Sequence, residues 1–219
     1  MKSNRVRVLL AAAAAGVALT ACSSPVQVGS VATVGGERIS SGRLDSEVRE
    51  FQAALKQAKI TEAQLQLPSI PRAVLLQLIY FRQFEQFAQR NGVTVSEGDI
   101  DKFITEQGGI EKIGPASLSK GVPPSETRQW IRTALIYQKS LERFGANLTD
   151  QNSVQVAQQK LFAQLDAIPV KVSHRYGAWD TQQGLVDEAR FGKPAEKPAG
   201  ADQLGDPAAD PAADPAAGQ

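Results

Sequence analysis

One segment, from Ser69 to Arg90, constrains the fold of this chain more than any other. Its apolar side chains fall on nearly every side of a helix rather than along one stripe. They are Val74, Leu75, Leu76, Leu78, Ile79, Tyr80, Phe81, Phe84 and Phe87. A helix with this much apolar surface needs neighbours on several sides to remove it from water. We therefore expect a central helix, ended by the left-handed conformation that Asn91 and Gly92 readily adopt.

An amphipathic helix is predicted before this central segment. Ser40 or Ser41 is suited to cap its N-terminus, because a serine side chain can accept a hydrogen bond from the first turn. Its apolar stripe recurs at steps of four and three residues: Leu44, Val48, Phe51, Leu55 and Ala58. Pro68 and Pro71 interrupt the pattern, so we expect a loop here with one short turn near Thr61.

Three more helices are predicted after the central one. We expect them from Ser96 to Gly108, from Ser125 to Phe144 and from Thr149 to Ile168, with a loop from Gly114 to Pro124. Ser96 is followed by Asp99 at the spacing of a capping signal. On the second helix the residues expected to face inward are Trp130, Ile131, Ala134, Leu135 and Leu141. On the third they are Val154, Ala157, Leu161, Leu165 and Ile168.

Three short strands are predicted at the two ends of this helical region. Val31–Val34 and Glu37–Ile39 flank Gly35 and Gly36, which supply the positive φ angles that a tight hairpin turn needs. Val170–Val172 alternates as a third strand. A lone hairpin is marginally stable, so the late strand is expected to pair with the early hairpin. The fold class is therefore mainly α, with about five helices and a small β element.

The N-terminus has the layout of an export signal. Three positive charges up to Arg7 precede an uncharged run from Val8 to Ala21. This run is shorter than the roughly 20 apolar residues that span a bilayer. It ends in Leu19-Thr20-Ala21-Cys22, which resembles the lipobox of bacterial lipoproteins. In that family the cysteine takes a diacylglyceryl group and the peptide is cut just before it. The resemblance implies a signal peptide at residues 1–21 and a lipid on Cys22; the alternatives are an uncleaved anchor or a plain buried cysteine.

The C-terminus has a different composition. From about Lys193 large apolar residues nearly vanish, and Asp-Pro-Ala-Ala repeats begin at Asp206, Asp210 and Asp214. Such a segment buries too little surface to offset its ordering entropy, so residues 193–219 are predicted to be a disordered tail. The expected organisation is a signal peptide at 1–21, a tether at 22–30, one folded domain at 31–192 and this tail.

Composition argues against several classes of function. Lys and Arg number 24 against 23 Asp and Glu, so no basic excess points to nucleic acid. One Cys and one His cannot make a zinc site, a redox pair or a disulfide. The chain contains neither a phosphate-loop motif nor a Gly-x-Ser-x-Gly motif. We expect no cofactor, no metal and no nucleotide, and we read Asp99 and Asp101 as a solvated pair at a helix start.

The order of these motifs is similar to that of a known family. Val31–Ser40 followed by Leu44 and Asp45 resembles the start of the N-terminal domain of SurA-type chaperones, and the foldase PrsA and its relatives open similarly. Gly35 stands where that family often has Asn, which still permits the turn. Gly92–Asp99 resembles a later helix boundary, and Arg175–Asp180 is similar to a closing segment in lipoprotein members. The resemblance covers about Val31 to Asp180.

The resemblance implies a chaperone fold without an isomerase activity. Family members with prolyl isomerase activity carry parvulin domains, and here the last helix is expected to run directly into Val170–Val172. His174 is the only histidine, whereas parvulin sites usually draw on more than one. We therefore expect no catalytic residue and read His174 as an exposed or hydrogen-bonded residue beside a strand.

Six apolar side chains are candidates for contacting a client polypeptide. They are Leu75, Ile79, Phe84, Trp130, Tyr137 and Phe162. Each has two interpretations: part of a helical core, or part of an apolar cradle for unfolded segments. Exposed apolar patches mark such surfaces, and sequence does not show which residues are exposed.

The leading hypothesis is a lipid-anchored, ATP-independent chaperone-like protein on the extracytoplasmic face of the membrane, with unfolded exported polypeptides as partners. The alternative is an envelope scaffold or adaptor lipoprotein with one dedicated protein partner. A cryptic hydrolase through His174 is a third hypothesis. A transporter's solute receptor fits less well, because such receptors usually need two larger α/β lobes.

Overall fold

A computed structural model describes residues 29–65, 67, 69–147 and 149–187. The predicted signal peptide, the lipidation of Cys22 and the predicted tail from Lys193 lie outside the described residues. The described part contains seven α-helices and two single-turn 3₁₀ helices. These are α1 (Ser41–Ala58), α2 (Glu62–Leu65), α3 (Ile70–Asn91), α4 (Glu97–Glu106), α5 (Ile110–Ser119), η1 (Pro124–Glu126), α6 (Thr127–Arg143), α7 (Gln151–Asp166) and η2 (His174–Tyr176).

Five short strands accompany the helices in the described part of the chain. They are β1 (Ser30–Val34), β2 (Glu37–Ser40), β3 (Val170–Val172), β4 (Ala178–Asp180) and β5 (Gly184–Val186). The mainly helical fold with a small antiparallel sheet confirms the predicted class.

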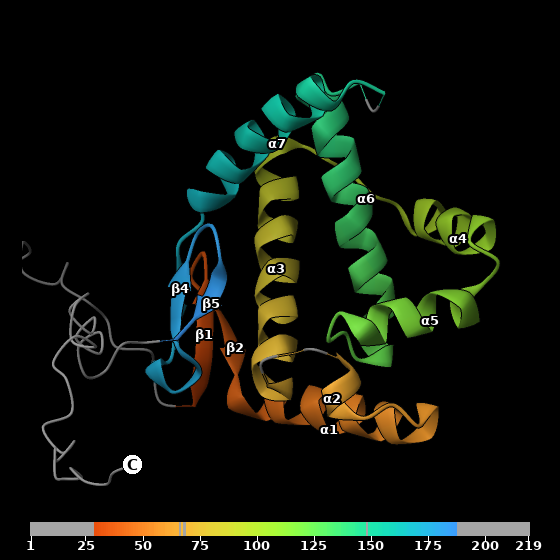
Figure 1. Ribbon diagram of the computed structural model, residues 1–219. Coiled ribbons are helices and arrows are strands. Elements are labelled where there is room, and N and C mark those ends of the chain that lie inside the picture. Colours follow the sequence, from red (N-terminus) through yellow and green to blue (C-terminus); the bar gives the residue numbers. More distant parts are fainter. Residues whose placement is uncertain (1–28, 66, 68, 148, 188–219) are drawn as a thin grey trace, which may run out of the picture. The chain divides into compact units, whose positions relative to one another are not determined.

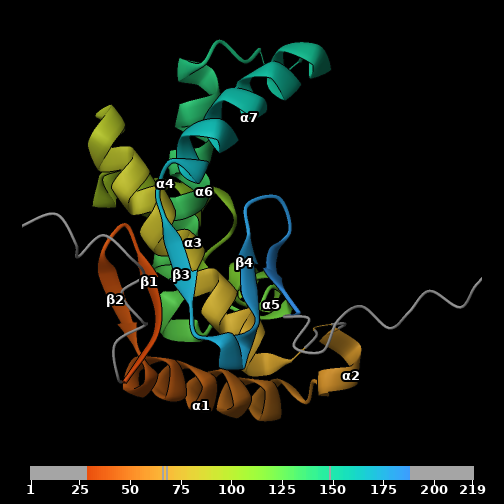
Figure 2. The same ribbon diagram turned by 90° about the vertical axis from the view of Figure 1, so that its left-hand side faces the viewer.

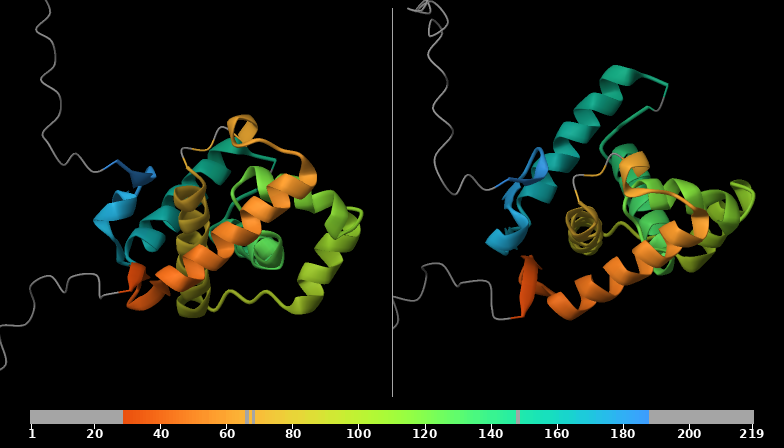
Figure 3. Two further views of the ribbon diagram at one scale, coloured as in Figure 1. Left: turned by 90° about the horizontal axis from the view of Figure 1, so that it is seen from below. Right: turned by 60° about the horizontal axis from the view of Figure 1, so that its bottom comes forward.

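Helix α3 occupies the centre of the fold, as its all-round apolar surface predicts. It packs against α1, α6, α7 and β1, and α6 runs beside it while α1 and α7 cross its two ends (Figure 1). Seen along its axis, α3 is enclosed by α1, α6, α7 and the strands (Figure 3). Its buried apolar residues are Ile70, Ala73, Val74, Leu75, Leu78, Ile79, Phe81, Phe84, Phe87 and Ala88.

The ends of α3 are set by local chemistry. The Ser69 hydroxyl accepts a hydrogen bond from the Arg72 N–H at 3.4 Å, and Pro71 lies in the first turn, where its missing N–H costs nothing. At the other end Gly92 has φ 63°, in the left-handed region. Both boundaries agree with the predicted helix to within a residue.

The three-stranded sheet joins the two ends of the described chain. Its order is β2-β1-β3, with both pairs antiparallel. Val34 pairs with Glu37 across the hairpin and with Val170 across the β1–β3 pair. The turn residues Gly35 and Gly36 have φ values of 56° and 93°, both positive as predicted. Figure 2 shows β3 beside the hairpin, which confirms the predicted closure of the late strand on the early one.

The hairpin turn is locked against α3 by one buried side chain. Gln86 of α3 donates a hydrogen bond from Nε2 to the Val34 carbonyl at 2.8 Å. Its Oε1 lies so close to Gly35 that a Cβ there would overlap it. The Gly35 N–H in turn donates to the Pro169 carbonyl at 2.8 Å. Gly35 is therefore required by packing as well as by the turn.

Helices α4 and α5 form a second, smaller layer against α6. Ile100, Ile113 and Ile131 bury one another there, apart from the main core. The Ser96–Asp99 capping box predicted for α4 is present. Asp99 also pairs with Lys139 at 2.9 Å and Asp101 with Arg128 at 2.9 Å, so these carboxylates connect α4 to α6 and are not merely solvated.

Three local predictions are wrong. The segment predicted as a loop from Gly114 contains most of α5, with Pro115 inside the helix. Proline costs helix stability, but the burial of Ile113 against α4 and α6 favours the helix. Ala134 is exposed, and Ile136 is buried in its place. Thr149 precedes the true N-cap of α7, Asp150.

The β4–β5 hairpin extends the fold beyond the single late strand that was expected. Within the described part of the chain its strands pair only with each other, with Trp179 opposite Leu185. Helix α7 ends at Asp166 and β3 begins at Val170, so the direct connection between them is as predicted. Within the described ranges, no helix has the length and apolarity needed to cross a membrane.

Candidate functional site

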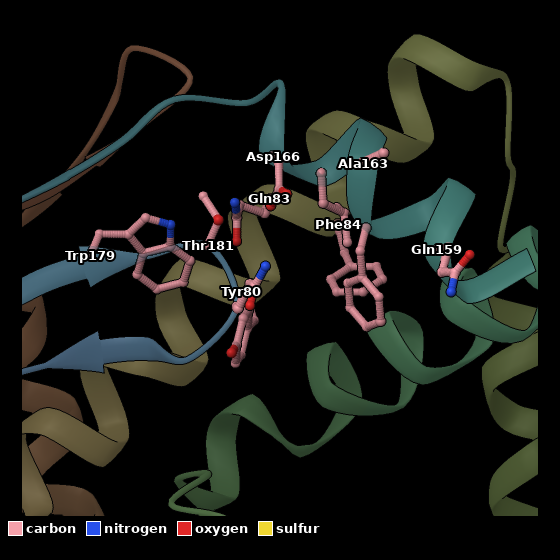
Figure 4. A pocket seen from close by; sticks show the side chains of 11 residues that line it. Tyr80, Gln83, Phe84, Gln159, Ala163, Asp166, Trp179 and Thr181 are labelled. Carbon is pink, nitrogen blue, oxygen red and sulfur yellow. The ribbon is translucent and has the colours of Figure 1, made fainter. Parts of the chain in front are cut away.

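A cleft of about 520 Å³ lies between α3, α7 and the β4–β5 hairpin. We call it the α3–α7 cleft. Figure 4 shows Trp179 and Thr181 on one side of it and Ala163 and Gln159 on the other, with side chains of α3 between them. Its lining residues are Tyr80, Gln83, Phe84, Gln159, Phe162, Ala163, Leu165, Asp166, Trp179, Thr181 and Gln182.

The α3 side of the cleft is formed by Tyr80, Gln83 and Phe84. Positions three and four residues apart lie on one face of a helix, so these three side chains face the cleft together. Burial raises the pKa of the Tyr80 hydroxyl above its ordinary value. This face of the central helix therefore offers two rings and one amide to the cleft.

The α7 side is more exposed than the α3 side. Phe162 remains 49% exposed although it is a large apolar residue. Neighbouring Leu165 is buried and fixes α7 to the core. Helix α7 crosses the end of α3 (Figure 1), and Phe162 lines the same cleft as Phe84 while staying open to solvent.

The β4–β5 hairpin supplies the third side. The Trp179 ring meets the Tyr80 ring edge-on, with centroids 5.9 Å apart and planes at 73°. The Asp180 carboxylate accepts hydrogen bonds from the N–H groups of Gln182 and Gln183, both at 2.8 Å. This turn places Thr181 and Gln182 at the edge of the cleft.

Arg72 of α3 anchors this hairpin. Its guanidinium donates to the Leu185 carbonyl at 3.1 Å and also pairs with the Asp187 carboxylate. Gly177 lets the hairpin close, because a Cβ at this position would overlap the Val186 carbonyl oxygen. The position of Trp179 in the cleft thus depends on contacts made at the N-terminal end of α3.

Two of the six predicted client-contacting residues lie together in the cleft. Phe84 and Phe162 both line it. The Tyr137 ring packs against the Phe84 ring, with centroids 6.4 Å apart, and its hydroxyl oxygen accepts a hydrogen bond from Gln158 Nε2. Trp130 packs between the two hydrophobic clusters of the fold, away from the cleft.

The other two candidates, Leu75 and Ile79, are core residues. Both are 0% exposed, so neither can touch a client in this conformation. The residues of α3 that do reach the cleft follow Ile79 in the helix, starting with Tyr80. Periodicity does not separate these faces, because α3 is apolar all round and only its neighbours decide which side is left open.

Sequence reasoning missed Tyr80, Gln83 and Trp179 as cleft residues. Tyr80 is one of the residues that make the central helix apolar on all sides, and Trp179 lies within Arg175–Asp180, the segment similar to a closing segment in lipoprotein members. The sequence signal for Trp179 is that segment alone. The contact of its ring with Tyr80 joins positions about a hundred residues apart in the sequence. No local pattern singles out Gln83.

Other features of the described chain are weaker candidates for a functional site than the α3–α7 cleft. A second groove of about 360 Å³ lies between α1 and α5, with Ile110 exposed at its edge. A polar depression of about 230 Å³ has the Arg43–Glu126 ion pair among its lining residues. His174 is exposed in η2, beside β3 as predicted. Within the described part of the chain, no three His, Cys, Asp or Glu side chains cluster as a metal site would need.

The comparisons with known proteins identify the family. The model of the SurA-like N-terminal domain family matches residues 1–114, more than half of the chain. The chain therefore belongs to the SurA-like N-terminal domain family, a chaperone-related family whose domain is of a non-catalytic type. No curated protein and no solved structure matches the chain. The match includes the α3 side of the cleft and ends before α6, α7 and the β4–β5 hairpin.

Proposed function

We propose that this protein is an ATP-independent chaperone-like protein that holds unfolded exported polypeptides. The observation that carries the proposal is the α3–α7 cleft, an apolar cleft left open in a member of a chaperone-related family. Tyr80, Phe84, Phe162 and Trp179 give it aromatic sides. Aromatic rings bury large apolar areas and suit partners of varied shape.

The dimensions of the cleft fit transient binding of a short segment. A volume of about 520 Å³ is in the range of ordinary ligand sites. It accommodates a few side chains rather than a folded domain. A client held there gains burial of its apolar side chains and loses it on release, so the cycle needs no nucleotide.

We propose that the protein works at the extracytoplasmic face of the cell membrane, anchored by lipid on Cys22. The support is the Leu19-Thr20-Ala21-Cys22 motif after a charged and then apolar run. Two acyl chains give stable anchoring where one binds only reversibly. Labelled palmitate is expected to enter the protein in growing cells, and Cys22→Ala is expected to abolish both labelling and membrane retention.

Aggregation suppression tests the holdase activity. The chain from Ser23 to Gln219, which keeps every described residue, is titrated into a refolding client without ATP while light scattering is read. Suppression is expected at a several-fold excess. Phe162→Ser is expected to weaken it, because this substitution removes an exposed apolar side of the cleft.

Val156→Ser is the matched control. Val156 is on the same helix and 50% exposed, but it does not line the cleft. Equal loss of activity in both variants would assign binding to general surface hydrophobicity. No suppression by the unmodified protein would overturn the proposal, and a single stoichiometric partner in crosslinked membranes would then favour an adaptor.

A further inference from the structure

One carboxylate at the edge of the α3–α7 cleft is left without a counter-charge. Asp166 is the last residue of α7 and lines the cleft. Among the described residues it has no hydrogen-bond or ion-pair partner. Apart from the Tyr80 phenol, it is the only titratable side chain among the described residues that line the cleft. The cleft therefore carries a net negative charge at neutral pH.

Because Asp166 lies at the C-terminal end of α7, the helix adds to the negative potential at this edge of the cleft. The C-terminal end of a helix carries partial negative charge from its unpaired carbonyl groups, and basic residues are normally favoured there. The last turn of α7 has no basic residue and ends in this carboxylate. Both contributions attract a cation and repel an anion at the same edge of the cleft.

An unpartnered amide faces the same cleft from α3. Gln83 is only 4% exposed, yet its side chain has no hydrogen-bond partner among the described residues. Among the described residues Arg72 Nε is the one fully enclosed side-chain polar atom without a hydrogen bond, so the Gln83 amide still reaches the open space of the cleft. It lines the cleft between Tyr80 and Phe84 (Figure 4). A primary amide offers one acceptor and two donor hydrogens, which match the C=O and N–H of a peptide main chain.

We propose that the α3–α7 cleft selects extended peptide segments in which an apolar side chain lies next to a lysine or arginine. The apolar side chain enters between Phe84, Phe162 and Trp179, and the cation pairs with Asp166. Gln83 hydrogen-bonds the main chain of the segment. This inference rests on the proposed function and adds the chemical class of segment that the cleft takes.

Three fluorescent peptides test the selection by anisotropy on the purified protein. One carries a Phe between two Lys residues in a Gly-Ser context. The second has Glu in place of Lys, and the third has Ala in place of Phe. The Lys peptide is expected to bind about fivefold more tightly than the Glu peptide at low salt, the size typical of an exposed charge pair at a helix end. The preference should largely vanish at about 1 M salt, where the screening length is about 3 Å.

Asp166→Asn identifies the group responsible. This substitution is expected to remove the preference for Lys over Glu and to leave affinity for the Glu peptide unchanged or improved. The matched control is Glu142→Gln, which removes one exposed negative charge near the end of α6, outside the cleft. If the preference persists in Asp166→Asn, or vanishes equally in Glu142→Gln, the assignment to Asp166 is overturned.

Gln83→Met tests the main-chain contact. Methionine is of similar length and apolar, so it fills the same space without an unpartnered amide. The Tm is expected to rise, because a buried polar group is removed, while affinity for the Phe-Lys and Phe-Glu peptides falls by the same factor. A purely structural role would instead lower the Tm and leave affinity alone, and that result would overturn the role given to Gln83.

The outcomes separate this inference from the proposed function. Equal binding of the Lys and Glu peptides, both stronger than the Ala peptide, would overturn the charge selection and leave the holdase proposal standing. Failure of all three peptides to bind, together with no suppression of aggregation, would overturn both.

Discussion

At the scale of single residues, this fold depends on a few positions where a neighbouring atom leaves no room for a Cβ. Gly35 is the clearest. Its φ of 56° lies in the left-handed region, which suits Gly and, among other residues, Asn. Here the Gln86 Oε1 occupies the space of a Cβ, so only glycine fits. The requirement for glycine is therefore set in part by a side chain 51 positions away in the sequence.

Gly35→Ala is expected to destabilise the protein by about 2–4 kcal/mol. About 1–2 kcal/mol comes from a non-glycine residue at positive φ, and the rest from displacing Gln86 and its hydrogen bond to Val34. Gly36→Ala is the control, because it has the same sign of φ with open space around it. Gly36→Ala should therefore lower the free energy of unfolding by only about 1–2 kcal/mol, the part that comes from the positive φ. Urea unfolding followed by circular dichroism measures both, and equal losses would show that Gln86 exerts no constraint.

The side chain of Glu47 makes the stability of the folded state depend on pH. Burial raises its pKa above the ordinary value, and the nearby carboxylate of Glu126 raises it further, while Arg43 acts in the opposite direction. A carboxyl whose pKa is raised by folding destabilises the folded state wherever it must be ionised. This penalty is fully present above the folded pKa and disappears as the pH falls through it.

Glu47→Gln is therefore expected to raise the Tm at neutral pH. The gain should shrink as the pH is lowered toward 4.5, the ordinary pKa of a glutamic acid. Thermal unfolding of the two proteins across this pH range measures the difference. A gain that is constant with pH would show that ionisation of Glu47 is not its source.

At the scale of elements, the β4–β5 hairpin depends on contacts outside itself. Among the strands that the structure describes, its two three-residue strands pair only with each other, and such a pair is marginal alone. Arg72 holds it through the Leu185 carbonyl and the Asp187 carboxylate, and Tyr80 holds it through the Trp179 ring. The side of the cleft that the β4–β5 hairpin forms is thus held in place by two residues of α3.

Arg72→Met is expected to loosen this hairpin locally. Losing charge-assisted hydrogen bonds worth about 1–2 kcal/mol should speed amide exchange about tenfold in residues 178–186 and leave the core unchanged. Hydrogen exchange read by mass spectrometry tests this. Arg90→Met is the control, since Arg90 lies exposed at the other end of α3. Unchanged exchange in the hairpin would mean that the Tyr80–Trp179 contact alone suffices.

At the scale of the whole described unit, folding requires the two ends of the sequence to meet. Strand β1 is central in its sheet only because β3 arrives after all seven helices. The Ser173 N–H to Val31 carbonyl bond at 2.8 Å and the Gly35 N–H to Pro169 bond complete this junction. Contacts of such sequence separation are costly to form early in folding.

Two truncations test this dependence. A chain that ends at Asp187 keeps the whole compact unit and is expected to retain the Tm of the full protein. A chain that ends at Pro169 loses β3 and the β4–β5 hairpin, and it is expected to lose cooperative thermal unfolding. Retention of a sharp transition in the shorter chain would show that the helices fold without the closed sheet.

The sequence by itself determined the local structure of this protein. The caps at Ser40, Ser69 and Ser96, the Gly-Gly turn and the all-round apolar character of α3 each act within a few residues, so their outcome is readable from order alone. The motifs taken together also identified the family, which the family model confirms. Helix α5 was the exception, because packing outweighed Pro115.

Only the tertiary structure decided which apolar and polar side chains remain available. Leu75 and Phe84 occur in the same apolar helix, yet one is sealed in the core and the other lines the cleft. Trp179 and Gln83 line the same cleft because β4 and α3, which are far apart in the sequence, lie close together in the fold. Exposure depends on what packs against a residue, and those neighbours come from distant parts of the chain, beyond the reach of any local pattern.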